Sequence, residues 1–331
     1  MSLLLVADIG GTNARFGLVD PTKNNNTYNY TAQEQITLRC ADYAHINDLI
    51  KACCASFNIE MPKHACFAIA GPIENGVVQM TNLDWKFSID ELRLQLGMTT
   101  LHVINDFAAL AYATPFLQEQ EIKTLYQAPA QPDAPIVVMG PGTGFGMALL
   151  VPNNSNWKII PTEGGHVSFA PTNEKELAIK SFLLKEQSHV SVEDVLSGSG
   201  LVNLYRALAH IAGVEAQPYT PAEVSIKGLA NDDAICRDAV VTFCNTLGSV
   251  AGDKALSSGA RGGVVIGGGI TPKLMELLPN TDFIARYKNK GPMAHYVNDI
   301  PVKLILNDKA ALIGAAAWLI HNSPGLRILL A

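Results

Sequence analysis

The sequence predicts an α/β protein of two domains, and three observations support that prediction. Apolar runs of strand length end in glycine-rich or polar turns, and they alternate with segments whose apolar residues recur at helical spacing. The chain has 331 residues, about the length of two ordinary domains. An apolar run, a Gly/Thr turn and a second apolar run follow one another once in each half, at residues 3–19 and 136–151.

Composition narrows the class of protein. With 48% hydrophobic and 16% charged residues, the chain is expected to be compact rather than disordered. A net charge of −6, without a basic run interleaved with aromatic residues, argues against nucleic acid or an acidic membrane as the main partner. The most apolar helical stretch, residues 310–320, is shorter than the roughly twenty residues that cross a bilayer. The six cysteines show no regular framework, which predicts reduced thiols in a cytoplasmic protein.

The first hairpin carries a turn suited to binding phosphate. Five uncharged residues precede Asp8 and predict a strand buried on both faces, while Gly10 and Gly11 can adopt the positive φ of a sharp reversal. Glycines let backbone N–H groups approach an anion, and Thr12 and Asn13 add donors. Asp8 could hold a hydrated Mg²⁺ that bridges the phosphates. An ordinary hairpin turn is the alternative interpretation.

Two further glycine clusters strengthen the phosphate interpretation. The second hairpin has its own Gly/Thr turn, at Gly142, Thr143 and Gly144. Two such hairpins in one chain are improbable as coincidence. A third apolar run ends at Gly267-Gly268-Gly269. A flat ring of a ligand could lie against this backbone, because glycine has no side chain.

Asn105 and Asp106 stand between a predicted strand at residues 101–104 and a helical run at 107–113. Ligands of α/β proteins bind where strands end at their carboxyl edge, which makes Asp106 a candidate functional carboxylate. The alternative is that Asp106 caps the helix by accepting hydrogen bonds from backbone N–H groups.

Two acidic residues and a histidine complete the candidates. Glu163-Gly164-Gly165-His166 contains too much glycine for a helix, so we expect a turn whose two polar side chains face one small ligand such as a sugar. An exposed turn without function is the alternative. Glu193 is predicted to lie just inside a helix at residues 191–196, where compensation of the helix dipole would also explain it.

Helical spacing predicts further helices, and Ser88 and Glu91 have the spacing of a capping box at the start of one of them. Gly314 and its alanine neighbours should let the last helix approach a sheet closely. The predicted helices span residues 45–57, 89–96, 174–185, 201–211, 234–258 and 309–320.

Taken together, these motifs resemble those of bacterial glucokinases in the hexokinase/actin-like ATPase superfamily, in the same order along residues 3–320. The resemblance implies a two-domain actin-like ATPase (ribonuclease H-like) fold with an interdomain cleft. Residues 1–110 plus 307–322 would form a small α/β domain, and residues 111–306 a large α+β domain. The motifs are Asp8-Ile9-Gly10-Gly11-Thr12-Asn13, Gly140-Pro141-Gly142-Thr143-Gly144, Glu163-Gly164-Gly165-His166 and Gly267-Gly268-Gly269.

The resemblance also implies an activity, the ATP-dependent phosphorylation of glucose at its 6-hydroxyl, with Mg²⁺. Asp106 would be the catalytic base and Asp8 the Mg²⁺ partner, while the first two glycine turns would bind phosphate and Gly267-Gly268-Gly269 the adenosine side. The expected glucose ligands are Asn82, Asn105, Glu163, His166 and Glu193. A homodimer is expected. A kinase for another hexose, or a sugar-responsive regulator without catalysis, is the alternative.

One feature of the wider repressor/kinase family is missing. Relatives there carry a cysteine-rich zinc site after the histidine, whereas here Phe169-Ala170-Pro171-Thr172 follows His166 with no cysteine nearby. We therefore expect no structural zinc. The first strand starts at Leu3, which argues against an amino-terminal DNA-binding extension.

Overall fold

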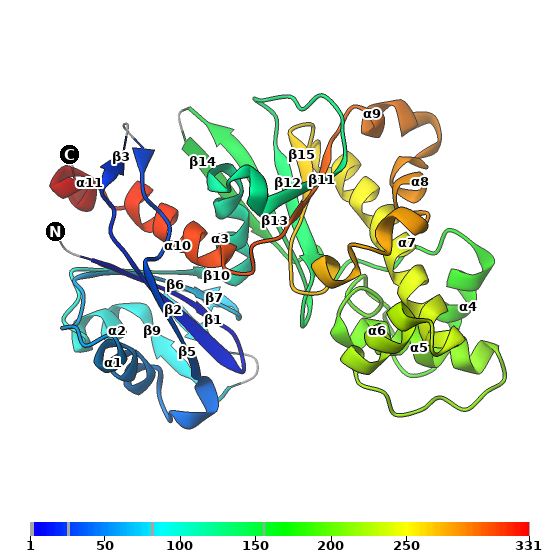
Figure 1. Ribbon diagram of the computed structural model, residues 1–331, viewed down its shortest axis with the longest axis horizontal. Coiled ribbons are helices and arrows are strands. Elements are labelled where there is room, and N and C mark those ends of the chain that lie inside the picture. The colour runs from blue at the N-terminus through cyan, green and yellow to red at the C-terminus, as the bar shows by residue number, and fades with distance from the viewer. Residues whose placement is uncertain (1–2, 25–26, 81–82, 155, 331) are drawn as a thin grey trace. The chain divides into compact units, whose positions relative to one another are not determined.

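The structure is a computed structural model that describes residues 3–24, 27–80, 83–154 and 156–330. The chain divides into two compact units (Figure 1). The first unit contains Met1–Gln118 and Asn307–Ala331, and the second contains Glu119–Leu306. The chain thus leaves the first unit once and returns to it for its last helices.

A five-stranded sheet in the order β10-β6-β1-β2-β5 forms the centre of the first unit. Strands β1, β6 and β10 run parallel, and β2 and β5 continue antiparallel from β1. The predicted first hairpin is therefore confirmed, and its first strand is buried on both faces as expected. The strands are β1 (Leu4–Ile9), β2 (Asn13–Val19), β5 (Glu34–Arg39), β6 (His64–Ile69) and β10 (Thr100–Asn105).

Helices cover both faces of this sheet (Figure 1). Apolar residues of α1 and α2 join the core on one face, and α3 and α10 pack on β6 from the other. As the capping pattern predicts, the Ser88 side chain accepts a hydrogen bond from the Glu91 N–H at the start of α2. The helices are α1 (Ile46–Ser56), α2 (Ile89–Gln95), α3 (Asp106–Ala113), α10 (Ala310–His321) and α11 (Pro324–Leu330). Short strands are β3 (Lys23–Asn24), β4 (Thr27–Tyr28), β7 (Ile73–Glu74), β8 (Val77–Gln79) and β9 (Lys86–Ser88).

Gly314 allows a close contact between two helices, rather than mainly a contact between a helix and a sheet. A Cβ added at Gly314 would lie 1.8 Å from the backbone oxygen of Ala109 in α3. The missing side chain lets the backbones of α10 and α3 touch, while α10 also packs on β1 and β6. The expected close approach is therefore real, but its tightest partner is a helix.

The second unit repeats the arrangement of the first. Its six-stranded sheet has the order β11-β16-β15-β12-β13-β14, with β16, β15 and β12 parallel and β13 and β14 antiparallel. The series β16-β15-β12-β13-β14 matches β10-β6-β1-β2-β5 in strand direction, so the repetition extends from the hairpins to both sheets. The strands are β11 (Ile122–Tyr126), β12 (Ile136–Pro141), β13 (Phe145–Asn153), β14 (Asn156–Thr162), β15 (Gly263–Ile266) and β16 (Val302–Ile305).

The long helix α7 has the predicted bounds, Ala234–Ser258, and lies against β12 and β15. Asp233 caps it by accepting hydrogen bonds from the N–H groups of Ile235 and Cys236. In this unit α6, α8 and α9 were not predicted from the sequence, and in the first unit α11 was not predicted. The helices are α4 (Glu174–Leu183), α5 (Gly198–Ile211), α6 (Pro221–Ala230), α7, α8 (Phe283–Lys288) and α9 (Ala294–Asn298).

The helix predicted at residues 191–196 is wrong. Ser191 and Asp194 close a single turn, in which Asp194 Oδ2 accepts hydrogen bonds of 2.7 Å from the Ser191 N–H and hydroxyl. The turn cannot continue as a helix because Ser197 is extended, with φ −142°, and caps α5 instead. Glu193 therefore lies in a turn and not at a helix start, which removes the helix-dipole explanation.

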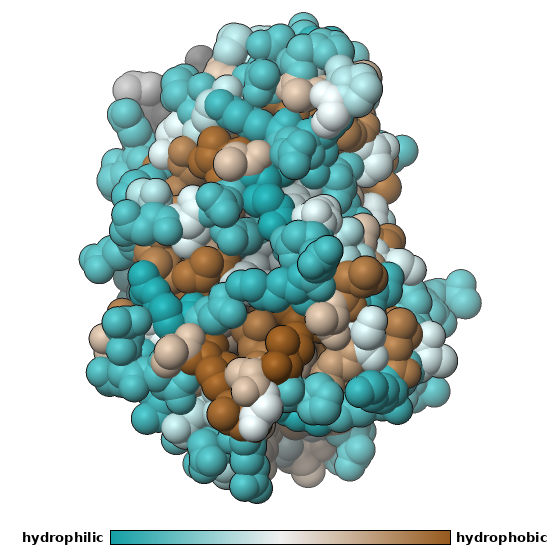
Figure 2. All heavy atoms as spheres, turned by 90° about the vertical axis from the view of Figure 1, so that its right-hand side faces the viewer, coloured by the Kyte–Doolittle hydropathy of each residue, from teal (hydrophilic) through white to brown (hydrophobic). Residues whose placement is uncertain are grey.

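The cysteine thiols lie in the interior, whereas several apolar residues lie at the surface of the second unit. All six cysteines are free and buried. Figure 2 faces the side on which α4, α5 and α6 lie and shows apolar side chains gathered in its lower part. Exposed apolar residues on or beside these helices are Leu177, Leu184, Ile211, Val214 and Ile226. Within the described ranges, no helix has both the length and the apolar character needed to cross a membrane.

Candidate functional site

Asp8 and Asp106 lie at the same edge of the first sheet. Asp8 is near the carboxyl end of β1, and Asp106 directly follows β10. Strand β6 lies between them, and its residue Ile69 pairs with Ile9 on one side and Asn105 on the other. The three parallel strands therefore end level with one another, at the carboxyl edge where α/β proteins bind ligands.

Asn105 is the N-cap of α3, whereas Asp106 is its first residue and accepts a single backbone hydrogen bond there. Asn105 Oδ1 accepts hydrogen bonds from the N–H groups of Phe107 (2.9 Å) and Ala108 (3.1 Å). Asp106 is the first residue of α3, and its Oδ1 accepts from the Phe107 N–H at 2.8 Å. Because Asn105 is the cap, Asp106 is not needed as the N-cap residue, although one of its oxygens is held by the Phe107 N–H.

Burial and a neighbouring charge perturb both carboxyls. Burial, together with the negative charge of Asp8, raises the pKa of Asp106 to about 6, although hydrogen bonds from Phe107 and Asn105 partly oppose the shift. Burial also raises the pKa of Asp8, and the Arg15 guanidinium opposes that effect. A carboxyl that titrates near neutral pH is suited to accept a proton during catalysis.

Arg15 connects Asp8 to the start of the last long helix. It faces Asp8 across the β1–β2 pair, with 3.9 Å between Arg15 Nη1 and Asp8 Oδ2. Arg15 also lies 3.9 Å from the Asp308 carboxylate and donates a 3.2 Å hydrogen bond to the Asp308 backbone oxygen. Asp308, which precedes α10, was not among the predicted site residues.

The first glycine turn is closed by backbone hydrogen bonds. The Gly10 N–H donates to the Asn13 oxygen at 3.0 Å, and the Cys40 N–H donates to the Thr12 oxygen at 2.9 Å. Neither Gly10 nor Gly11 is among the described glycines with a positive φ, so the expected conformational role is wrong. Thr12 and Asn13 are exposed at the tip, which leaves their side chains open to a ligand.

In the second unit, the second and third glycine clusters lie against each other. A Cβ at Gly140 would be 2.1 Å from the Gly267 oxygen, and one at Gly268 would be 2.3 Å from the Pro141 oxygen. Gly268 also has a φ of +84°, which favours glycine. The Gly142 N–H donates to the Gly144 oxygen at 2.8 Å, and Gly142 and Gly269 both face open space. The two clusters thus form one surface of exposed backbone.

The amino-terminal end of α5 adjoins this surface and was not predicted as part of the site. Its Gly198 N–H donates to the Gly142 oxygen at 3.0 Å, and Ser197 caps the helix through the Gly200 N–H. The positive end of a helix dipole attracts anions. The run Ser197-Gly198-Ser199-Gly200 before a helical pattern was the sequence signal for this feature.

Glu193 joins two of the predicted motifs. Its Oε2 accepts a 2.6 Å hydrogen bond from the Phe145 N–H, directly after the second glycine turn. Its own N–H donates to the Gly165 oxygen at 2.9 Å, inside the Glu163–His166 turn. The carboxylate therefore holds the glycine hairpin next to the acid and the histidine.

Glu163 and His166 occupy the turn that the sequence predicts. The His166 N–H donates to the Glu163 oxygen at 3.1 Å, and His166 Nε2 lies 3.8 Å from Glu163 Oε2. The Glu163 side chain is 90% exposed and the His166 side chain 62% exposed, so both are open to a ligand on the surface of the second unit.

The structure therefore collects the predicted residues into two groups, one in each unit. The described part of the chain contains no group of three or more histidine, cysteine, aspartate or glutamate residues arranged to hold a metal ion. Asn82 lies outside the described residues. The first group contains Asp8, Gly10, Gly11, Thr12, Asn13, Asn105 and Asp106, and the second contains Gly142, Thr143, Gly144, Glu163, His166, Glu193, Gly267, Gly268 and Gly269.

Known glucokinases are similar to this chain over nearly its whole length. The profile of the Glucokinase family matches residues 5–322. The chain is 44% identical to the glucokinase of Chromobacterium violaceum over 97% of its own length and 90% of that protein. It is 40% identical to the glucokinase of Saccharophagus degradans, covering 95% and 97% of the two chains.

Solved structures similar to this chain include glucokinases. The crystal structure of a glucokinase from an Antarctic psychrotroph aligns with a TM-score of 0.87 at 40% identity, over 98% of this chain and 100% of that one. A glucokinase of the ROK family from Streptomyces griseus, solved with glucose and AMPPNP, shares the fold at a TM-score of 0.64 and 18% identity, over 96% and 99% of the chains. These neighbours have a two-domain actin-like ATPase fold, which confirms the predicted fold class. The chain belongs to the glucokinase family.

Proposed function

We propose that the chain transfers the γ-phosphoryl group of ATP to the 6-hydroxyl of glucose, with Asp106 as the catalytic base. The family to which the chain belongs supports a sugar kinase. The observation that carries the assignment of Asp106 is its position, since this carboxylate follows β10 at the ligand edge of the sheet and has a pKa raised to about 6. At neutral pH it is mostly ionised and able to accept a proton.

Phosphoryl transfer requires the protein mainly to position the two reactants. Phosphoryl transfer passes through a loose transition state, so the protein has little covalent work to do. Asp106 would orient the sugar hydroxyl by accepting its hydrogen bond, and it would take the proton as the new P–O bond forms. An alcohol is too weak an acid to ionise earlier. The Asp8 charge that raises the pKa of Asp106 makes it a stronger base.

Polar side chains are the proposed ligands of the sugar. Glu163 and Glu193 can accept hydrogen bonds from sugar hydroxyls, His166 can donate or accept, and the Asn105 amide can donate because its oxygen caps α3. Asn82 is proposed as a further ligand from the family resemblance alone.

Backbone N–H groups would bind the nucleotide. The turns at Gly10–Asn13 and Gly142–Gly144 offer N–H groups and hydroxyls to phosphate, and the start of α5 adds a helix dipole. The Gly267–Gly269 backbone, which is exposed at Gly269, would lie against the adenosine.

Asp8 fits a magnesium ion that is shared with phosphates. Mg²⁺ keeps several waters and takes only one or two carboxylates in kinases, so a single partly buried carboxylate is a sufficient protein ligand. Asp8 meets that description; burial raises its pKa, and the nearby Arg15 guanidinium opposes that rise. When bound, Mg²⁺ would neutralise phosphate charge.

A coupled assay over several hexoses and phosphoryl donors tests the proposal. Wild type should turn over glucose with ATP, and Asp106→Asn should lower kcat by about 10²–10⁴-fold, the usual contribution of a general base. Glucose binding, measured by calorimetry, should stay within a few fold, because an amide still forms hydrogen bonds. The matched control is Asp90→Asn, since the Asp90 side chain is 86% exposed on α2. A near-normal rate in Asp106→Asn would remove Asp106 from its role.

We also infer a cytoplasmic homodimer. Free, buried thiols support a reducing compartment, and the exposed apolar residues of α4, α5 and α6 support self-association. Light scattering on the purified chain should give twice the mass of one chain, and a single-chain mass at micromolar concentration would contradict the dimer.

A further inference from the structure

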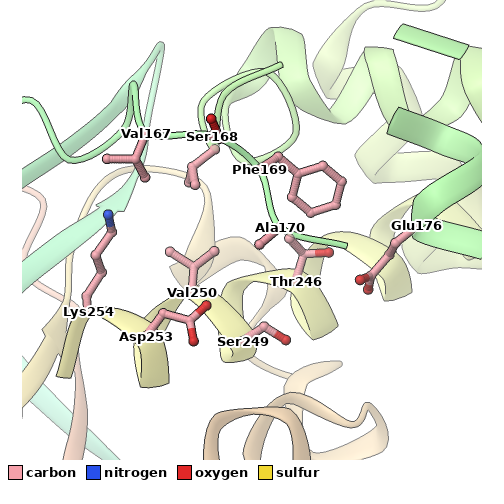
Figure 3. Close-up of a pocket in the computed structure, with 11 residues that line it drawn as sticks. Val167, Ser168, Phe169, Ala170, Glu176, Thr246, Ser249, Val250, Asp253 and Lys254 are labelled. Carbon is pink, nitrogen blue, oxygen red and sulfur yellow. The ribbon is translucent and has the colours of Figure 1, made fainter. Parts of the chain in front are cut away.

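A cavity of about 150 Å³ lies in the second unit, between α7 and the segment that follows His166 (Figure 3). Val167, Phe169 and Val250 supply apolar walls. A cavity of this size accommodates a molecule of about six or seven non-hydrogen atoms. None of the predicted site residues lines it, so it is separate from the proposed glucose and ATP ligands.

Lys254 brings an unpaired charge to this cavity. The residue as a whole is only 8% exposed, and in the described ranges its ammonium has no hydrogen-bond or ion-pair partner, although the nitrogen is not among the atoms sealed from solvent. Figure 3 shows the Lys254 side chain extending along the cavity toward Val167. Burying an ammonium without a counter-charge is unfavourable.

The two carboxylates of the cavity already have other partners. Asp253 pairs with Lys290 at 2.8 Å, and Glu176 pairs with Arg286 at 2.5 Å. Each of these carboxylates already has a cationic partner, so Lys254 has no carboxylate in direct contact. Burial lowers the pKa of Lys254, although the charge of Asp253 opposes the shift.

A second unpaired polar group lies further along the same helix. Thr246 is 1% exposed, and its hydroxyl is buried without a hydrogen-bond partner in the described part of the chain. Thr246 precedes Lys254 by eight residues, which is about 12 Å along an α-helix. The cavity therefore has a cation toward one end, a hydroxyl toward the other and the apolar side chain of Val250 between them.

We propose that this cavity is a binding site for a short-chain monoanion that carries a second polar group at its far end, such as an ω-hydroxy carboxylate. The anionic group would pair with Lys254, a short methylene chain would lie against Val250, and the far hydroxyl would bond to Thr246. Each unpaired group of the cavity would then gain a partner.

Occupancy of the cavity is coupled to the Glu163–His166 turn. The cavity wall at Val167–Phe169 continues directly from His166, and the Val192 N–H donates to the Val167 oxygen at 2.9 Å. The next residue, Glu193, bonds to Gly165 in the same way. A ligand that moves this wall would change the affinity for glucose. This consequence rests on the proposed function, whereas binding in the cavity does not.

Calorimetry with the full chain tests the site, using 4-hydroxybutyrate as the probe. Wild type should bind it with a Kd on the order of 1 mM. Butyrate lacks the hydroxyl and 1,4-butanediol lacks the charge, so both should bind more weakly. Lys254→Met should weaken 4-hydroxybutyrate at least tenfold, and Thr246→Val should weaken it several fold without affecting butyrate. Lys185→Met, at an exposed lysine outside the cavity, should match wild type.

Absence of saturable binding to wild type, or equal binding to Lys254→Met, would overturn the site. A crystal structure of wild type with the probe gives an answer even if a variant misfolds, because the carboxylate must lie within hydrogen-bond distance of Lys254 Nζ. The glucose KM should change when the probe is present. An unchanged KM with the probe bound would overturn only the coupling. A chain that binds the probe but does not phosphorylate glucose would contradict the proposed function and support the site.

Discussion

Glu193 Oε2 accepts a 2.6 Å hydrogen bond from the backbone N–H of Phe145, 48 residues earlier in the chain. This bond connects a candidate glucose ligand to the hairpin proposed to bind phosphate. The same carboxylate leaves no room for a side chain at Gly144, where a Cβ would be 2.4 Å from Oε2. Glu193 is therefore both a candidate ligand and a support for the turn.

Substitutions of Glu193 should separate these two roles. Glu193→Gln keeps an acceptor oxygen for Phe145, so we expect a glucose KM about tenfold higher and nearly unchanged stability. Glu193→Ala leaves the buried Phe145 N–H without a partner, which should lower the free energy of unfolding by about 1–3 kcal/mol. Steady-state kinetics and urea denaturation measure the two effects, with the exposed Glu215→Gln as control. Equal stability of the Gln and Ala variants would refute the supporting role.

The second glycine turn offers a matched pair of substitutions. Gly144→Ala must displace the Glu193 carboxylate and break its bond to Phe145, so both the free energy of unfolding and glucose affinity should fall. Gly142→Ala places its Cβ in open space, so stability should stay within about 0.5 kcal/mol. The ATP KM of Gly142→Ala should rise, because the methyl group would occupy the position proposed for phosphate. An unchanged ATP KM would argue against phosphate at this turn.

The third glycine cluster offers another pair. Gly268 has a φ of +84°, and a Cβ there would lie 2.3 Å from the Pro141 oxygen, so Gly268→Ala should lower the free energy of unfolding by about 2 kcal/mol or more. Gly269→Ala meets nothing within 4 Å and should leave stability within about 0.5 kcal/mol. Urea denaturation of both variants measures the difference. If the two variants proved equally stable, the close packing of Gly268 on Pro141 would be ruled out.

The pH dependence of activity should report the carboxyl of Asp106. The proposed base must be ionised, and its pKa is raised to about 6, so kcat/KM for glucose should fall below pH 6 with a slope of one. Asp8→Asn removes a negative charge that raises this pKa, so the inflection of the residual activity should move to lower pH. The exposed Asp90→Asn should keep the wild-type inflection. An inflection that Asp8→Asn leaves in place would show that another group controls the profile.

The raised pKa of Asp106 also predicts that stability falls as pH rises, whereas activity should increase over the same range. An aspartate whose pKa rises from 3.8 to about 6 on folding binds its proton more tightly in the folded state, so its contribution to stability is lost as pH rises from about 4 to 6. Asp106→Asn removes that penalty and should raise the free energy of unfolding at pH 7.5 by up to about 3 kcal/mol. Below about pH 4 the two proteins should be equally stable. Chemical denaturation at both pH values measures the effect, and a less stable variant at pH 7.5 would contradict it.

Local patterns in the sequence were sufficient for most elements. The two glycine hairpins, the bounds of α7 and the Ser88 cap of α2 follow from features that lie within a few residues of one another. The turn at Glu163–His166 was predictable for the same reason, because two adjacent glycines disfavour a helix wherever they stand. The helix predicted at residues 191–196 failed because Ser197 is extended and begins the next helix.

Tertiary structure decided the contacts between distant residues. The sequence by itself determined that Asn105 and Asp106 follow a strand, whereas the folded backbone decided that Asn105 caps α3 and leaves the Asp106 carboxylate free of that role. It likewise decided that Gly314 meets α3, that Glu193 holds Phe145, and that α5 begins beside Gly142. The cap at Asn105 is local, but the partners of Gly314, Glu193 and Gly142 are tens to hundreds of residues away, whereas periodicity and turn chemistry act over a few residues. Only the packing of complete helices and sheets brings such partners within hydrogen-bond distance.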